Sequence, residues 1–82
     1  MPDTSIIKVY GTNSCSDCVR SKAFLDQQKV PYQWIDLEQD TAAQEYVRKL
    51  NHGRMITPTI VFPDGSFLAE PGNAELARKL KR

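Results

Sequence analysis

Two cysteines lie three residues apart in the sequence, in the segment Cys15-Ser-Asp-Cys18. Residues at this spacing share one face of a helix, with Cβ atoms about 5 to 6 Å apart, so a small adjustment brings the sulfurs to disulfide distance. Unpaired backbone N–H groups and the helix dipole stabilise a thiolate in the first turn of a helix. We therefore expect Cys15 to be the nucleophile. Cys18, one turn further on and better shielded, is expected to resolve the mixed disulfide that Cys15 forms.

Two other uses of the cysteine pair are open from the sequence. As a structural disulfide it would close a loop of four residues. Such a bond would stabilise the fold by less than the roughly 3 kcal/mol expected for a loop of 15 residues, because it restricts the unfolded chain less. As a metal site it supplies two of the four ligands that structural zinc requires, and His52 is the single histidine of the chain. A zinc or iron–sulfur site therefore needs two chains. The redox interpretation is favoured, with no bound metal or cofactor, and the non-catalytic metal-binding dimer is the alternative.

Asp17 places a negative charge between the two cysteines. An aspartate near a helix N-terminus complements the helix dipole. It also opposes thiolate formation: at roughly 6 Å and an effective dielectric of about 40, the repulsion is about 1.4 kcal/mol, or about one pKa unit. Because that repulsion destabilises the ionised dithiol relative to the neutral disulfide, we expect Asp17 to make the couple more reducing, by about 30 mV.

The composition of the 82 residues predicts a single small domain spanning residues 1–82, with 40% hydrophobic residues and a formal net charge of +1. So small a charge gives no basic patch for a nucleic acid. No apolar run is long enough for a membrane span, and residues 1–6 do not resemble a signal peptide. We expect a cytoplasmic monomer. Cytoplasmic thiols are kept reduced, which favours a catalytic or metal-binding cysteine pair over a structural one.

Hydrophobic patterning predicts the element order β-α-β-α-β-β-α. The expected strands are 6–10, 32–37, 59–62 and 66–69, and the expected helices are 15–28, 40 or 41 to 50, and 74 to about 82. Ser14 is the expected N-cap of the first helix. Asp40 or Thr41 is expected to cap the second, where Thr41-x-x-Gln44 has the capping-box form. A right-handed crossover joins the first two strands in parallel, and the hairpin adds antiparallel neighbours.

Three segments together resemble a glutaredoxin of the thioredoxin fold, over essentially the whole chain. They are the strand Ile7-Lys8-Val9-Tyr10, the Cys15–Cys18 pair, and Thr57-Pro58-Thr59 at the start of a strand. The stretch from Pro58 to Gly65 and the overall length are similar to the mycoredoxin branch of actinobacterial glutaredoxins. The resemblance implies an α/β fold of the thioredoxin/glutaredoxin type, with a four-stranded mixed sheet flanked by three helices. It also implies a thiol-disulfide oxidoreductase that reduces mixed disulfides between proteins and a low-molecular thiol.

The resemblance further implies which residues contact the substrate. In the family the proline at position 58 is cis, and the backbone of Thr57 pairs with the cysteinyl backbone of a bound mixed disulfide. From the residues alone, a trans proline that begins a strand would be favoured. Arg54, with Lys8 and Arg20, could attract an anionic thiol. The predicted substrate-binding residues are therefore Ser14, Ser16, Asp17, Arg54, Thr57 and Pro58.

Departures from the family pattern bear on which thiol is used. Glutathione-dependent members usually carry a lysine where this chain has Thr12. They also carry a Gly-Gly and acidic pair before the last helix, where this chain has residues 70–74, Glu-Pro-Gly-Asn-Ala. Mycoredoxins lack both features, so mycothiol is favoured over glutathione, although Asp17 replaces the aromatic residue common in both groups. The alternative is a redoxin reduced by thioredoxin reductase, a flavin enzyme, that donates electrons to ribonucleotide reductase or other proteins.

Overall fold

The elements of the chain follow the predicted order. The computed structural model describes residues 6–80. They form β1 (Ile7–Gly11), α1 (Ser16–Gln27), β2 (Tyr32–Asp36), α2 (Thr41–Leu50), β3 (Thr59–Val61), β4 (Phe67–Ala69) and α3 (Asn73–Leu80). The bounds differ from the expected ones by at most one residue, and positions 81–82 of the last expected helix lie outside the described residues. Within residues 6–80, no helix combines the length and apolar character needed to cross a bilayer.

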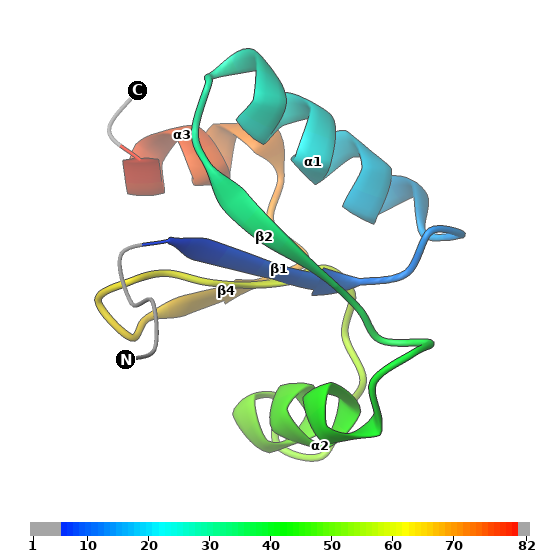
Figure 1. Ribbon diagram of the computed structural model, residues 1–82. Helices are drawn as coiled ribbons and strands as arrows, with labels where there is room; N and C mark the ends of the chain where they lie inside the picture. Colours follow the sequence, from blue (N-terminus) through cyan, green and yellow to red (C-terminus); the bar gives the residue numbers. More distant parts are fainter. Residues whose placement is uncertain (1–5, 81–82) are drawn as a thin grey trace.

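The four strands form one mixed sheet in the order β2-β1-β3-β4. Strand β1 pairs in parallel with β2 and antiparallel with β3, and β3 pairs antiparallel with β4. Helices α1 and α3 lie over one face of the sheet and α2 over the other (Figure 1). The predicted fold class, a four-stranded mixed sheet flanked by three helices, is therefore confirmed.

Alternation along the strands divides the core between the two faces, because successive side chains of a strand point to opposite sides. The larger cluster contains buried residues of the sheet, of α1 and α3, and of the loop after β3: Ile7, Val9, Leu25, Ile60, Phe62 and Leu76. The smaller cluster, around α2, contains Tyr10, Leu37, Ala43 and Val47. The sheet is therefore anchored on both faces, but by fewer residues on the α2 side.

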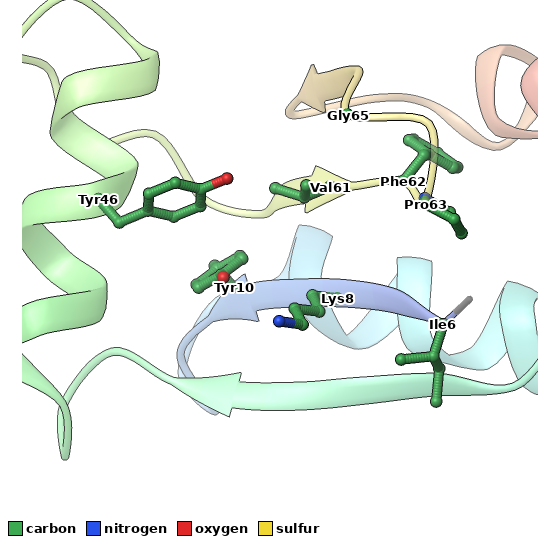
Figure 2. A pocket seen from close by; sticks show the side chains of 8 residues that line it. All are labelled: Ile6, Lys8, Tyr10, Tyr46, Val61, Phe62, Pro63 and Gly65. Carbon is green, nitrogen blue, oxygen red and sulfur yellow. The ribbon is translucent and has the colours of Figure 1, made fainter. Parts of the chain in front are cut away.

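The face toward α2 is only partly covered. A cavity of about 410 Å³ lies there, and Lys8, Tyr10, Tyr46 and Val61 are among the residues that line it (Figure 2). The rings of Tyr10 and Tyr46 close one side, with centroids 5.4 Å apart. Lys8, considered above as a cation that attracts a thiol, therefore lines this cavity rather than the one beside Thr57.

Helix α2 begins with Asp40 as its N-cap, and Asp40 Oδ1 accepts a hydrogen bond from the Ala43 N–H at 3.0 Å. The alternative cap at Thr41, with its capping box, is wrong. The Gln44 side chain does not return to the helix start but donates to the Leu37 carbonyl. Gln44 thereby ties α2 to the turn after β2.

The end of α2 fixes the loop that precedes β3. Asn51, the C-cap residue, is buried, and its Nδ2 donates to the Val47 carbonyl at 2.9 Å and to Thr59 Oγ1 at 3.1 Å. The Thr59 hydroxyl in turn donates to the Ile56 carbonyl at 2.7 Å. Residues 56–59, which include Thr57 and Pro58, are therefore bound to the helix by a buried polar network.

Replacing Asn51→Ala should lower the free energy of unfolding by about 2 kcal/mol, because the buried amide makes two hydrogen bonds that water cannot replace. Urea unfolding measures the change. Gln33→Ala, which removes an exposed amide from β2, is the matched control and should change stability by less than about 0.5 kcal/mol. Equal stability of the two variants would show that the Asn51 network does not hold the loop.

Candidate active site

Cys15 occupies the turn between β1 and α1 and is itself the N-cap of α1. Its backbone is extended, with φ −89° and ψ 114°, and its sulfur accepts a hydrogen bond from the Cys18 N–H at 3.2 Å. The predicted cap, Ser14, is therefore wrong. Residues 12–15 form a turn, closed by a hydrogen bond from the Cys15 N–H to the Thr12 carbonyl, so the helix begins one residue later than expected. Ser14 lies exposed in that turn, with its hydroxyl 3.4 Å from that of Thr12.

The loop before β3 brings Thr57 against the same sulfur. Thr57 Oγ1 donates to Cys15 Sγ at 3.5 Å, and the Cys15 thiol lies 3.8 Å from the Thr57 carbonyl oxygen, which can accept from it. The Thr57–Pro58 peptide bond is cis, as the family resemblance implies. Pro58 is fully buried, and its carbonyl accepts a hydrogen bond from the Glu70 N–H at 2.7 Å. Two segments 42 residues apart thus meet at one sulfur.

These contacts set the acidity of Cys15. Burial alone would raise the pKa of the Cys15 thiol, but hydrogen bonds from the Cys18 thiol, the Thr57 hydroxyl and the N–H groups of Cys18 and Asp17 outweigh it. The net effect lowers the pKa of Cys15 below its ordinary value of 9.0. Since the thiolate is the reactive form, the site favours Cys15 as a nucleophile.

Cys18 has the opposite character. It lies in α1 three residues after Cys15 and is fully buried. Burial, followed by the hydrogen bond that its thiol gives to Cys15, raises the pKa of Cys18 to about 12. Both cysteines are thiols in this structure, and between residues 6 and 80 no three His, Cys, Asp or Glu side chains gather as metal ligands. The pair therefore consists of a reactive thiol and a shielded one.

Gly11 leaves the space that Cys18 fills. A Cβ at position 11 would overlap Cys18 Sγ and would lie 3.1 Å from Trp34 Cη2. The strand cannot easily move aside, because the Gly11 carbonyl accepts a hydrogen bond from the Leu37 N–H at 2.9 Å. From the sequence, Gly11 only marks the end of a strand. Its second role is to leave room for the buried Cys18 thiol against the strand backbone. This role is visible only in the three-dimensional structure.

Asp17, between the cysteines, is not a lone charge. Its Oδ1 lies 3.1 Å from Arg20 Nη1, and both side chains are partly exposed. Arg20 Nη2 also donates to the Pro71 carbonyl at 3.4 Å. The expected repulsion between Asp17 and a thiolate is therefore opposed by a neighbouring cation, Arg20, which the sequence indicated only as a residue that could attract an anionic thiol.

A small groove of about 230 Å³ opens beside Thr57. It is lined by Thr12, Leu37, Glu38, Gln44, Arg48, Met55 and Thr57. Of the predicted substrate-binding residues, Thr57 lines it, whereas Arg54 is exposed and is not among the lining residues. Arg48 of α2 is the cation on the groove, and it was missed. Gln44 and Arg48 are four residues apart on one helix, a spacing that indicates a shared face. Ser16 is exposed in the first turn of α1.

The chain is similar in sequence to known glutaredoxins. The family model described as glutaredoxin matches residues 7–68. A Mycobacterium tuberculosis protein that is named a glutaredoxin is 36% identical over 77 residues, which cover 94% of this chain and 92% of that protein. Mycoredoxin 1 of Corynebacterium glutamicum is 35% identical over 77 residues, covering 94% and 95%.

Solved structures agree on the fold. A mutant of the thioredoxin-like protein BC3987 superposes with a TM-score of 0.78 at 32% identity, covering 90% of this chain and 97% of that chain. A glutaredoxin of Archaeoglobus fulgidus gives a TM-score of 0.82, covering 98% and 90%, at 19% identity. At that identity the likeness concerns the fold alone.

Gly11→Ala should reduce the free energy of unfolding by about 1 to 3 kcal/mol, because the new methyl group overpacks the site of the Cys18 sulfur. Chemical denaturation of the reduced protein measures the loss. Removing the sulfur relieves the overlap, so Gly11→Ala combined with Cys18→Ala should lose at least about 1 kcal/mol less than the sum of the single variants.

The matched control is Gly72→Ala, since a Cβ at position 72 would have no atom within 4 Å. That variant should change stability far less than Gly11→Ala. Additive effects of Gly11→Ala and Cys18→Ala would mean that position 11 does not make room for the buried thiol.

Proposed function

We propose, since the chain belongs to the glutaredoxin family of thiol-disulfide oxidoreductases, that it reduces mixed disulfides between proteins and a low-molecular thiol, with mycothiol favoured. The observation that carries the proposal is the position of the Cys15 sulfur. It lies at the N-terminus of α1, touches Thr57 beside a cis-proline, and has a buried second thiol one turn further along the helix. The family works with thiols and protein disulfides, without a bound cofactor.

In the first step, the Cys15 thiolate attacks the low-molecular sulfur of the mixed disulfide. A bond forms between these two sulfurs, the original disulfide bond breaks, and the protein leaves as a thiolate that takes a proton from water. Thr57 is the neighbour of the attacking sulfur, and the cysteinyl part of the low-molecular thiol would lie along its backbone. The groove beside Thr57 would hold the rest of that molecule.

Two routes release the low-molecular thiol from the adduct. Only the first regenerates the reduced enzyme, because the second leaves an internal disulfide that a further thiol must reduce. A second low-molecular thiolate can attack the adduct, forming its own disulfide and releasing the Cys15 thiolate. Alternatively Cys18 attacks Cys15 Sγ, transfers its proton to the departing thiolate, and forms the internal disulfide. Besides burial, which is the main cause, the hydrogen bond to Cys15 and the Cys15 charge contribute to the high pKa of Cys18. Both are lost once Cys15 is in a disulfide, so Cys18 becomes easier to ionise at the stage when it must attack.

The preference for mycothiol rests on the charges near the site. Glutathione has two carboxylates, whereas mycothiol is a neutral, hydroxyl-rich molecule. Thr12 offers no charge to a carboxylate, and Arg20 is already bound to Asp17 and to the Pro71 carbonyl. The groove beside Thr57 is lined by one cation, Arg48, and one anion, Glu38. A neutral thiol therefore suits this site better, and a mycoredoxin is among the relatives.

The test uses a Cys18→Ser variant, so that an adduct on Cys15 cannot be resolved. The reduced variant is incubated with equal amounts of oxidised mycothiol and oxidised glutathione and analysed by intact mass spectrometry. We expect a predominantly mycothiolated protein. A Cys15→Ser variant, treated in the same way, is the control and should carry no adduct.

The other outcomes have separate meanings. Predominant glutathionylation would contradict the mycothiol preference and return the protein to the glutathione-dependent group. If neither adduct forms although Cys15 reacts with iodoacetamide, the low-molecular-thiol mechanism is wrong. Thioredoxin reductase would then be the electron donor to test.

A further inference from the structure

The Arg20 guanidinium joins the active-site helix to the loop before α3. One nitrogen, Nη1, lies 3.1 Å from Asp17 Oδ1, and the other, Nη2, donates to the Pro71 carbonyl at 3.4 Å. A guanidinium presents its donors in a rigid planar fork, so one side chain can hold two acceptors at once. Arg20 is the fifth residue after Cys15, and Asp17 lies between the two cysteines.

These two contacts complete a closed path around the nucleophile. Pro71 follows Glu70, whose N–H donates to the Pro58 carbonyl at 2.7 Å. Pro58 follows Thr57, whose hydroxyl donates to Cys15 Sγ at 3.5 Å. Cys15 begins the helix that carries Arg20. The path therefore runs from the sulfur through the cis-proline loop and the loop before α3, and returns through Arg20 to the same helix.

The same cation also affects the charge around the sulfur. Helix α1 carries four charged side chains, Asp17, Arg20, Lys22 and Asp26, of which Asp17 and Arg20 form an ion pair. Cys18 is kept neutral by its high pKa. On the opposite side, the groove carries Glu38 and Arg48, again one of each sign. Removing either member of the Asp17–Arg20 pair would leave the other charge without its partner on the helix that Cys15 begins.

We propose that Arg20 is a positioning residue for the thiol chemistry: it cancels the charge of Asp17 and holds the loop before α3 against the active-site helix. The inference rests on Cys15 being the nucleophile of the proposed function. It does not depend on which low-molecular thiol is used, so either claim can fail without the other.

The charge role is tested by the pH dependence of Cys15 alkylation with iodoacetamide, in a Cys18→Ser background. Arg20→Met leaves Asp17 unopposed and should raise the pKa of Cys15 by about half to one unit, from Coulomb's law at roughly 7 Å and a dielectric of about 40 to 80. Asp17→Asn leaves Arg20 unopposed and should lower it by a similar amount. The double variant should return to within about 0.3 units of the parent.

A control variant separates this effect from the loss of any surface cation. Arg78→Met removes an exposed charge from the last turn of α3 and should leave the pKa of Cys15 unchanged. Shifts of the same sign in Arg20→Met and Asp17→Asn would overturn the charge role. So would a shift in Arg20→Met that Asp17→Asn does not reverse, because that pattern indicates general disruption of the helix.

The bracing role is tested by amide hydrogen exchange at Glu70 in the same proteins. Arg20→Met removes the contact with Pro71, so exchange of the Glu70 N–H should accelerate at least threefold, while Arg78→Met leaves it unchanged. Arg20→Lys keeps the charge but lacks the fork, and should therefore show parental acidity of Cys15 together with accelerated exchange at Glu70. Parental exchange in both Arg20 variants would overturn the bracing role.

Discussion

The contact of the Cys15 sulfur with the first backbone N–H groups of α1 is the interaction on which the site depends. The sulfur takes the place of the side-chain oxygen that usually caps a helix. The same hydrogen bond therefore caps α1 and stabilises the thiolate. Thr57 adds a second donor from a distant loop. Burial opposes ionisation at both cysteines, but only at Cys15 do the hydrogen bonds outweigh it. Two identical side chains, three residues apart, thereby acquire different acidities.

The rest of the fold holds this arrangement in place. The end of β1 is a glycine, which lets the buried thiol pack against the strand. The Asn51 network fixes the loop that carries Thr57, and the Glu70 N–H binds that loop at Pro58. Interior packing is dense enough that small displacements of such segments are felt at the site they meet. The core residues of both faces therefore contribute to the reactivity of one sulfur without touching it.

The sequence indicated those parts of the site that depend on local spacing. The order of elements and the position of the cysteine pair after a strand follow from hydrophobic periodicity, and helix geometry predicts that Cys15 is the more acidic of the two thiols. The predicted N-cap of α1 was wrong by one residue. Helices are usually capped by Ser, Thr, Asp or Asn, so a cysteine was not expected there, although the Cys15 sulfur accepts the capping hydrogen bond. Arg54 was predicted because it is close to Thr57 in sequence, whereas the cation that lines the groove beside Thr57 is Arg48 of α2. The role of Gly11 and the partners of Arg20 arise from contacts between distant segments, which periodicity cannot reveal.

The two thiols differ in acidity because of their hydrogen bonds and burial. The most direct measurement is a ¹³C NMR titration of the reduced protein, labelled at the cysteine Cβ atoms, which follows both thiols in one sample. Cys15 should ionise below 9.0, so its thiolate persists as the pH falls until that lower pKa is passed, whereas Cys18 should stay protonated until about pH 12. Ionisation of both thiols near 9.0, or of Cys18 before Cys15, would contradict the account.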